Sequence, residues 1–535
     1  MKIFFRLTIL PLLLVLFITG CKKGTNSQIS KGSNQEITIN ITSEPQTLDP
    51  RKVRGLNDAN LIRMFMEGLT RTDKNGDYTL AIAKKVDISA DNMKYTFTLR
   101  DSKWSNGDPV TSQDFSYAWK KSLSPDFNSP SANMLYVIKG AKEAKLGKLP
   151  LSLVGIETPD EKTLIITLDQ PVPYFLTLID HPIYFPVNSK IDRINSHWAE
   201  KETTYIGNGP FILSDWKHQN IIVAKKNPNY WDQNTVYLSQ ISMIMVNEDV
   251  GFKMFDTNKL NWDGSPFSTI PVDAIETLKN TEKLQITPVL ATEWIRVNTE
   301  KFPFASKKMR QAFAYAIDRA AIVNHVVQGN QIPATGIVPI SMELQKNPYF
   351  NDGDIDTAQQ LFQEAIDELG GNVQGLPEIT LLYSSSQRNH LIAQTLQAQW
   401  REAFGVCVRL ESIESKVFFD RMSKKTYVLS LGNWFADFND PLAFLEVFKT
   451  KDVGTNNTNW ENPNYHELLE ASCHCSTKEE RDSILRQSEE ILISEMPVIP
   501  IFHFTMLYMQ DDQLKDVALT PMGNIDFKWA KISSK

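Results

Sequence analysis

The sequence predicts an α/β fold with parallel strand pairing, and three local patterns support this prediction. The first is a β-α-β order, in which strands expected over 379–383 and 406–410 flank a helix expected over 390–403. The second is a set of strand-length apolar runs, such as 95–99 and 163–168. The third is a series of capped helices with one apolar face. At 535 residues the chain exceeds a single core and predicts several domain-sized units.

The other elements are expected on similar grounds along the chain. A strand is expected over 36–41 and another over 241–246, and apolar residues at helical spacing predict a helix over 60–69. A further helix is expected to end at Leu369, because two glycines follow it. Helix caps are expected at side chains that can accept from the first free backbone N–H groups: Thr111, Ser306, Thr357 with Gln360, and Thr477 with Glu480.

The segment Tyr427–Pro441, YVLSLGNWFADFNDP, combines a strand pattern with an acid set among aromatic rings. Its first five residues have the length and composition of a buried strand. Gly432 and Asn433 are expected to bend the backbone after that strand, and the last three residues predict a turn that starts the next helix. Asp437 stands between these two turns, flanked by phenylalanines.

Two interpretations of Asp437 stay open on this local pattern. Acids in such positions often cap a helix or pair with an arginine of the core. Alternatively, a carboxylate held among rings has little water around it and binds a cation of a ligand. An ammonium group suits it, through a charge-assisted hydrogen bond worth about 1.5–3 kcal/mol.

The first 20 residues are expected to be a signal peptide that is not part of the fold. Lys2 and Arg6 give a positive start, and the apolar run over 7–18 is too short for a comfortable membrane span. The sequence ITGC that ends at Cys21 resembles a bacterial lipoprotein signal, in which this cysteine is lipidated and becomes the first residue. Residues 21–35 are polar, which predicts a flexible tether. The body then lies outside the cytoplasm; the alternative is an uncleaved anchor.

Charge and motifs argue against nucleic-acid binding, catalysis and metal binding. The net charge is −7 without a concentrated basic stretch, so nucleic acid is not an expected partner. His466-Glu467 lacks the second histidine of a zinc-protease helix, and the sequence has no phosphate-binding loop and no nucleophile elbow. Beyond the leader, the odd number of cysteines (Cys407, Cys473 and Cys475) rules out full pairing, and the Cys-His-Cys spacing fits no usual zinc site. We therefore expect no enzyme, no cofactor and no metal.

The segment 95–119, YTFTLRDSKWSNGDPVTSQDFSYAW, closely resembles the signature of extracellular solute-binding proteins of the oligopeptide and dipeptide transporter family. The resemblance runs from about Glu36 to the C-terminus. Its other motifs occur in the order typical of the family: SEPQTLDP at 43–50, DQPVPYF at 169–175, GNGPF at 207–211, NPNYW at 227–231, KFPF and MRQAFAYAIDR near 301–319, and WFADFNDP at 434–441.

This resemblance implies a two-lobed periplasmic-binding-protein-like fold of class II, of the large peptide-binding type, with an extra inserted domain. Hinges are expected where the chain crosses between lobes, near Ala291 and near Phe504. The expected boundaries are 36–66, 189–289 and 506–535 for the first lobe, 67–188 for the inserted domain, and 290–505 for the second lobe.

The same resemblance implies where a ligand binds. In oligopeptide-binding relatives the acid of a W-x-A-D motif takes the ligand ammonium, and Asp437 occupies that position here. The backbone of Asn433, Trp434 and Phe435 is expected to pair with an extended ligand, and Trp434 is expected to line a side-chain pocket.

The chain departs from the family pattern at the basic positions that meet a ligand carboxylate. Leu431, Val327 and Asn389 stand where the family has basic residues, and Arg54 stands where close relatives have an acid near the ligand. Arg54 and Arg421 are therefore candidates for a relocated positive charge, because a guanidinium binds a carboxylate bidentately. A solvated surface charge is the alternative for each arginine.

The resemblance implies a monomeric, lipid-anchored receptor on the periplasmic or cell-surface side of a bacterial membrane. It would close on an oligopeptide or peptide-like solute and deliver it to an ABC transporter permease. Alternative ligands within the same class are a cell-wall peptide, a nickel chelate or haem. The alternative of another class is a surface adhesin or chaperone-like protein, because a fold does not settle function.

Overall fold

A computed structural model describes residues 35–53, 55–73, 77–345, 347–451, 454–475 and 477–533. The expected signal peptide, Cys21, nearly all of the expected tether, and Arg54 lie outside these residues. The described chain folds into mixed α/β structure around an 11-stranded sheet, which confirms the predicted fold class.

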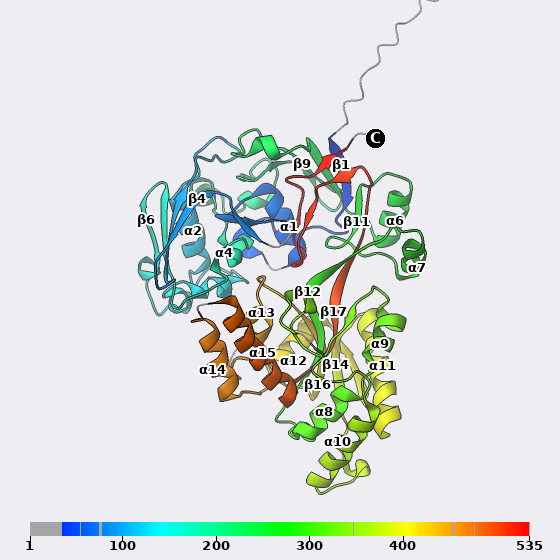
Figure 1. The fold of residues 1–535 in the computed structure, drawn as a ribbon. Helices are drawn as coiled ribbons and strands as arrows, with labels where there is room; N and C mark the ends of the chain where they lie inside the picture. The colour runs from blue at the N-terminus through cyan, green and yellow to red at the C-terminus, as the bar shows by residue number, and fades with distance from the viewer. Residues whose placement is uncertain are drawn as a thin grey trace, which may run out of the picture. The chain divides into compact units, whose positions relative to one another are not determined.

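The large sheet draws its strands from both ends and the middle of the chain (Figure 1). In sheet order the strands are β15 (Arg409–Ile413), β14 (Thr380–Ser384), β16 (Leu429–Phe435), β12 (Gln285–Val297), β17 (Val498–Gln510), β11 (Trp262–Gly264), β1 (Glu36–Asn40), β10 (Gln240–Ile244), β9 (Ile221–Lys226) and β8 (Phe211–Lys217), with β13 (Ile332–Pro333) paired to β17. β14 pairs in parallel with both β15 and β16. The predicted β-α-β pairing is therefore confirmed, although its second strand begins at Arg409 instead of 406.

Two long strands, β12 and β17, lie side by side in this sheet and connect β15, β14 and β16 on one side with β11, β1, β10, β9 and β8 on the other. They pair antiparallel over most of their 13 residues each. Figure 1 shows them running from the region of β1 and β11 to the region of β14 and β16. Their register shifts between Pro288 and Thr292, close to Ala291, and such an irregularity weakens a ladder locally. A hinge at this point and the lobe boundaries given above remain proposals.

A separate four-stranded antiparallel sheet occupies part of the segment expected as the inserted domain. Its order is β4 (Ala83–Ile88), β5 (Lys94–Leu99), β7 (Thr163–Thr167) and β6 (Ile156–Asp160), and helix α2 (Ser112–Ser122) packs against β6. Three short antiparallel pairs accompany the two larger sheets: β2 (Thr70–Thr72) with β3 (Tyr78–Leu80), β18 (Leu514–Lys515) with β21 (Lys531–Ile532), and β19 (Ala518–Leu519) with β20 (Ile525–Asp526).

Helices cover these sheets, and no helix in the described ranges is both long and apolar enough to span a membrane. The remaining α-helices are α1 (Leu56–Phe65), α3 (Ala141–Lys145), α4 (Phe175–Leu178), α5 (Ser189–Ile194), α6 (Glu248–Asp256), α7 (Val272–Asn280), α8 (Lys307–Tyr315), α9 (Arg319–Ile322), α10 (Ile355–Glu368), α11 (Gln387–Phe404), α12 (Ser415–Ser423), α13 (Leu442–Leu445), α14 (Pro463–Ser472) and α15 (Lys478–Glu495).

Two of the predicted helix starts are confirmed by side-chain caps. The Ser306 hydroxyl accepts from the backbone N–H of Met309 at the start of α8. The Thr477 hydroxyl likewise accepts from the N–H of Glu480 at the start of α15. Each bond satisfies one of the N–H groups that a helix leaves free in its first turn.

Two other predicted helix positions are wrong. The cap of α10 is Asp354, whose carboxylate accepts from the N–H of Thr357 at 3.1 Å, so the helix starts before the predicted cap. The helix predicted over 60–69 is α1, which ends at Phe65. It stops there because Met66 takes an extended conformation, and the amide oxygen of Asn208 then accepts from the N–H of Glu67.

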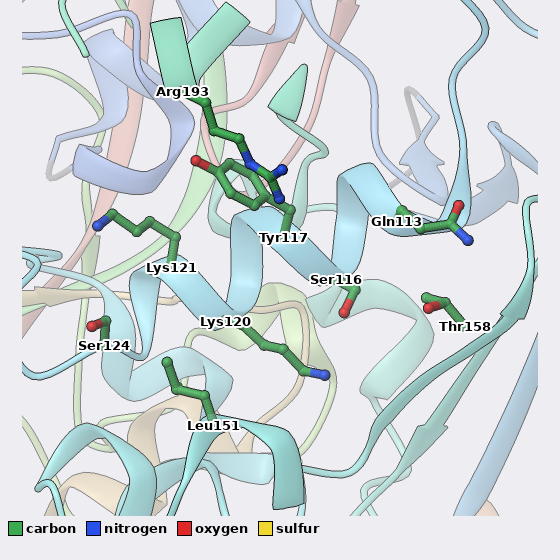
Figure 2. A pocket seen from close by; sticks show the side chains of 9 residues that line it. All are labelled: Gln113, Ser116, Tyr117, Lys120, Lys121, Ser124, Leu151, Thr158 and Arg193. Atoms are coloured by element: carbon green, nitrogen blue, oxygen red, sulfur yellow. The ribbon is translucent and has the colours of Figure 1, made fainter. Parts of the chain in front are cut away.

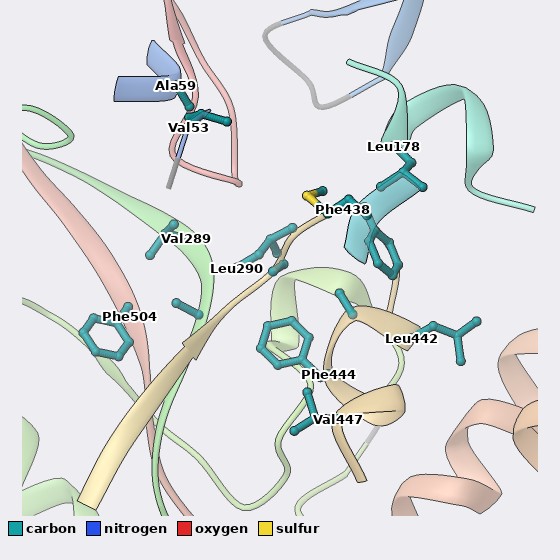
Figure 3. Packing of buried hydrophobic residues seen from close by; sticks show 14 of the residues in the cluster. Val53, Ala59, Leu178, Val289, Leu290, Phe438, Leu442, Phe444, Val447 and Phe504 are labelled. Atoms are coloured by element: carbon teal, nitrogen blue, oxygen red, sulfur yellow. The ribbon is translucent and has the colours of Figure 1, made fainter. Parts of the chain in front are cut away.

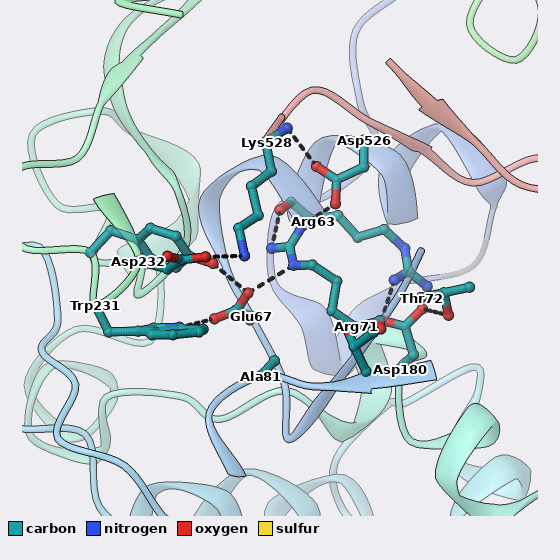
Figure 4. A network of polar contacts seen from close by, with 12 residues as sticks. Arg63, Glu67, Arg71, Thr72, Ala81, Asp180, Trp231, Asp232, Asp526 and Lys528 are labelled. Atoms are coloured by element: carbon teal, nitrogen blue, oxygen red, sulfur yellow. Dashed lines mark hydrogen bonds and ion pairs between the residues drawn. The ribbon is translucent and has the colours of Figure 1, made fainter. Parts of the chain in front are cut away.

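A buried polar network ties the C-terminal tail to the segment after α1 (Figure 4). Arg71 pairs with Glu67 at 2.7 Å and with Asp526 of the tail. Glu67 also accepts from the Tyr230 hydroxyl and the Trp231 indole, each at 2.6 Å. Both rings belong to the NPNYW motif, so this motif serves the fold by satisfying a buried carboxylate.

Candidate functional site

The candidate site lies at the edge of the large sheet where three parallel strands end. β15, β14 and β16 run in the same direction, so Ile413, Ser384 and Phe435 all lie at that edge. Ligands of open α/β sheets bind outside the carboxyl ends of such strands, where the chain leaves the sheet. Asp437 follows the end of β16 by two residues.

β16 runs farther than the sequence predicted. The expected bend at Gly432 and Asn433 is wrong, because β16 stays paired with β12 until Ala291 lies opposite Phe435. The long partner strand holds the segment extended, and a pattern confined to the local residues does not reveal that partner.

The other side of β16 is open over its last five residues. β14 pairs with β16 only at Leu429 and Ser430. From Leu431 to Phe435 this side has no strand partner within the described ranges. An extended ligand can add to such an edge as a further strand, with backbone hydrogen bonds that do not depend on its side chains.

Asp437 lies just beyond the open edge, with an exposed side chain. In the described part of the chain its carboxylate has no hydrogen-bond or ion-pair partner. Nearby protein nevertheless replaces part of its hydration shell, and this desolvation raises the pKa of the Asp437 carboxyl to about 6. Asp437 is not a helix cap either, since α13 begins after Pro441 and it is Asp440 that accepts from the N–H of Leu442, at 2.9 Å. Its role as a ligand residue stays a prediction.

The three residues before this acid differ in how they are held. Trp434 is half-buried, and its indole N–H donates to the Ala443 carbonyl at 2.7 Å. Phe435 is 44% exposed, with its ring centroid 5.4 Å from that of Phe504. Asn433 is exposed on the same strand. Trp434 therefore fixes the strand end, and Phe435 is partly exposed. The Asn433 side chain lies beside the buried Glu293 carboxylate, its partner in the register with β12.

Apolar side chains fix the loop that carries the acid (Figure 3). Phe438 is buried, and its ring stacks on Tyr174 with centroids 3.9 Å apart. Figure 3 shows Phe438 beside Leu178 of α4, with Leu290 of β12 also near the loop. The N–H of Ala436 donates to the Leu290 carbonyl at 2.8 Å. The loop is thus held on both sides while the carboxylate between them has no partner among the described residues.

The two arginines predicted to meet a ligand carboxylate have different outcomes. Arg54 lies outside the described residues. Arg421, in α12, directs all three nitrogens at the protein: Nη1 bonds Glu411 at 2.6 Å, and Nε and Nη2 both donate to the Thr426 carbonyl. Binding a carboxylate at Arg421 requires some of these contacts to break, and that role remains a prediction.

A further arginine, Arg388, lies at the edge of the site and is not among the residues predicted from the sequence. Arg388 is in the first turn of α11, directly after β14, and its side chain is 43% exposed. The available signal was its position beside Asn389, one of the places where the family has a basic residue. Its contact with Glu293, 95 positions away in sequence, could not be read from the local pattern.

A basic hollow of about 450 Å³ lies over α2 (Figure 2). Three cations line it, but Figure 2 shows the ammonium groups of Lys120 and Lys121 pointing in different directions. The Lys120 ammonium donates to the Ile156 carbonyl at 3.2 Å, and Arg193 lies 5.2 Å from the centroid of the Tyr117 ring. Because the charges diverge, the hollow does not offer them jointly to one anion.

Cysteine and histidine side chains form no metal site within the ranges that the structure describes. No three His, Cys, Asp or Glu side chains group there so as to hold an ion. Cys407, Cys473 and Cys475 are free thiols, and burial raises the pKa of Cys473.

Sequence comparisons agree with the motif resemblance. The model described as "Bacterial extracellular solute-binding proteins, family 5 Middle" matches residues 77–456. The oligopeptide-binding protein OppA of Bacillus subtilis (strain 168) is 38% identical over 540 residues, which cover 99% of both chains. The dipeptide-binding protein DppE of the same strain is 34% identical over 520 residues, which cover 95% of this chain and 94% of the relative.

Solved structures share the fold over nearly the whole chain. OppA of Haemophilus influenzae in complex with RPPGFSPFR has a TM-score of 0.79 at 25% identity, covering 94% of this chain and 99% of that one. The murein tripeptide binding protein MppA of Escherichia coli has a TM-score of 0.79 at 27% identity, with the same coverage. This likeness confirms the predicted two-lobed α/β fold of class II.

Proposed function

Because the chain belongs to family 5 of the bacterial extracellular solute-binding proteins, we propose that it captures oligopeptides or peptide-like solutes between its lobes and delivers them to an ABC transporter permease. The family consists of solute-binding proteins and not of enzymes, in agreement with the expectation from the motifs. Relatives named as oligopeptide- and dipeptide-binding proteins match almost the entire chain and support the peptide class.

The observation that carries the proposal is the carboxylate of Asp437 beside the open edge of β16. The carboxylate is partly desolvated, and the described residues supply no cation for it, so an ammonium group from a ligand would restore its lost electrostatic stabilisation. The open edge from Leu431 to Phe435 would hold the ligand backbone. Both interactions use groups that every peptide with a free N-terminus has, which permits ligands with different side chains.

The residues around Asp437 would complete this site. Asn433 and Phe435 lie on the part of β16 that the ligand backbone would pair with. Trp434 would form the wall of a side-chain pocket while its indole stays bonded to Ala443. Closure of the lobes over the ligand would couple binding to recognition by the permease.

A thermal-shift screen tests the proposal on protein from which any co-purified ligand has been removed. Short peptides, including cell-wall peptides, should raise the melting temperature, because a ligand at a hundredfold excess over its Kd adds about 2.7 kcal/mol to folding stability. A nickel chelate and haem serve as comparison ligands. A shift with one of these and with no peptide would favour that ligand class. A shift with none of them would favour the adhesin or chaperone-like alternative. Native mass spectrometry of protein from its own host would then weigh any trapped ligand.

We also propose that lipid on Cys21 anchors the body to the membrane. This part rests on the sequence alone, since Cys21 lies outside the described residues. Acylation attaches proteins through buried methylene groups, so Cys21→Ala should release a folded body from the membrane fraction. Fractionation of cells that express the variant measures this, and unchanged retention would contradict lipid anchoring.

A further inference from the structure

Arg388 is built into the site edge as an exposed cation with a fixed position. Its Nη2 pairs with the Oε2 of Glu293 at 2.5 Å, and Glu293 is fully buried on β12. The guanidinium carbon lies 4.7 Å from the centroid of the Phe504 ring and 5.8 Å from that of Phe502. A carboxylate on one side and two rings beneath restrict the orientation of the planar group.

The rest of the guanidinium is available to a ligand. Within the described ranges, only Nη2 of Arg388 has a hydrogen-bond partner, which leaves Nε and Nη1 without one. The side chain is 43% exposed, so a ligand can approach it from solvent. A guanidinium with one donor anchored and others free can still bind a carboxylate in the plane of the fork.

Arg421 is a useful comparison, because all of its guanidinium nitrogens are engaged by the protein. All three of its nitrogens donate to Glu411 or to the Thr426 carbonyl. Its side chain is 28% exposed, against 43% for Arg388. Both arginines pair with a glutamate, but only Arg388 keeps unpartnered donors in the described structure.

Arg388 and Asp437 both lie near the end of β16 that carries the open edge. Arg388 follows β14, the strand that stops pairing with β16 after Ser430, and Asp437 follows β16 itself. The Phe504 ring contacts both Arg388 and Phe435, so the guanidinium lies within roughly 10 Å of the Phe435 ring. Each residue of an extended peptide spans about 3.3 Å, so a few residues cover this separation. Asp437 follows Phe435 by two positions in the chain.

We infer that Arg388 binds the carboxylate end of the ligand whose ammonium end is held by Asp437. The inference rests on the proposed function, and it makes the preferred ligand a short peptide with both ends free. It also replaces Arg54 and Arg421 as the expected source of the relocated positive charge. Glu293 then acts as a positioning residue that orients the guanidinium from below the site surface.

The burial of Glu293 determines how the inference can be tested. Burial raises the pKa of Glu293 to about 7, and the nearby charge of Arg388 opposes that rise. Removing Arg388 alone would take the ion-pair partner from the buried Glu293 and leave it with the nearby Asn433 side chain and the charge of Arg296, and such a loss destabilises a fold. A variant that tests the inference must therefore neutralise both members of the pair together.

Calorimetric titration with trialanine, tetraalanine and pentaalanine, each as the free acid and as the C-terminal amide, tests the inference. Wild type should bind the free acid of at least one length about tenfold or more tightly than its amide, as expected for a charge-assisted bond of about 1.5–3 kcal/mol. The Arg388→Gln/Glu293→Gln variant should lose most of this preference. Arg421→Gln should keep it.

Each outcome decides a separate point. If wild type binds neither form of any length, the proposed function is at fault for this peptide series. If it binds both forms equally, peptide capture stands and the Arg388 inference is overturned. Loss of the preference in Arg421→Gln, with retention in the double variant, would assign the carboxylate to Arg421.

Should the double variant fail to fold, Arg388→Lys is the second test. It keeps the charge beside Glu293 but removes the guanidinium fork, so the preference for the free acid should fall several-fold. An unchanged preference would overturn the inference.

Discussion

The rings of Tyr174 and Phe438 stack face to face, with centroids 3.9 Å apart and planes 1° from parallel. Tyr174 lies in the segment expected to form the inserted domain. Phe438 lies in the segment expected to form the second lobe, one residue after Asp437. The stack therefore joins two segments that are far apart in sequence, directly beside the acid proposed to hold the ligand.

We predict that this stack strengthens peptide binding. An aromatic pair contributes about 0.5–1.5 kcal/mol beyond its buried area, and this pair exists only while the two segments stay together. Phe438→Ala should weaken peptide affinity, and its effect should be smaller in a Tyr174→Ala background. Titration of one peptide across the double-mutant cycle measures the coupling.

A second aromatic stack serves as the control. Phe362 and Phe404 stack between α10 and α11, so Phe362→Ala should lower stability without changing affinity. Zero coupling between Tyr174 and Phe438 would contradict the prediction.

We predict that Gly207→Ala, in the GNGPF motif, destabilises the protein by about 2 kcal/mol or more. A Cβ at this position would collide with the Phe65 carbonyl oxygen, which is part of a helix end and cannot move freely. Gly371→Ala is the matched control, because nothing lies within 4 Å of a Cβ there, and its effect should stay within about 0.5 kcal/mol. Urea unfolding of both variants measures the difference, and equal effects would refute this account of the motif.

The arginine that follows the SEPQTLDP motif is predicted to be essential to the fold. Arg51 is buried between Asp49 and Asp192, with contacts of 2.8 and 2.6 Å. Arg51→Met would leave two buried carboxylates without their cation, so the free energy of unfolding should fall by about 3–5 kcal/mol. Lys424→Ala removes an exposed pair with Asp420 and should cost about 0.5 kcal/mol or less. Denaturant midpoints compare the two, and similar losses would show that the buried triad has no special role.

We predict that Asp437→Asn stabilises the ligand-free protein at neutral pH. The pKa of Asp437 is raised to about 6 in the folded protein, so the charged form costs folding free energy above that pH. As pH falls from about 6 to about 4, the wild-type carboxyl becomes protonated in the folded state and this cost disappears. The melting temperature of the variant should therefore exceed that of wild type at pH 7.5 and match it near pH 4. A difference that does not depend on pH would mean that titration of Asp437 is not its cause.

Local patterns in the sequence predicted those elements whose signals are themselves local. Ser306 and Thr477 cap helices as expected, because a cap bonds only to residues within its own first turn. Thr357 was predicted as the cap of α10, but the Asp354 carboxylate accepts the capping bond and the helix starts earlier. The parallel pairing of β14 and β15 followed from the intervening helix.

Features set by distant partners could not be predicted in this way. β16 stays straight through Gly432 because β12 pairs with it, and no local residue encodes that contact. Arg388 was missed because Glu293 and Phe504, which define its position, are distant in sequence. Asp437 was found because its aromatic neighbours are adjacent in the chain. Its lack of a partner in the described structure became visible only with the fold.

The central claim, that Asp437 binds the ammonium of a peptide, is tested most directly by one calorimetric titration of four pairings. Wild type and Asp437→Asn are each titrated with one peptide that carries a free amine and with its N-acetylated form. The amide is isosteric with the carboxyl group, so the variant should fold. We predict that the variant binds the free-amine peptide about 2–5 kcal/mol more weakly than wild type does, because one partner of a desolvated charge pair is lost. The acetylated peptide should bind wild type poorly and lose much less in the variant. Equal losses for both peptides would show that Asp437 has only a structural role, which would contradict the claim.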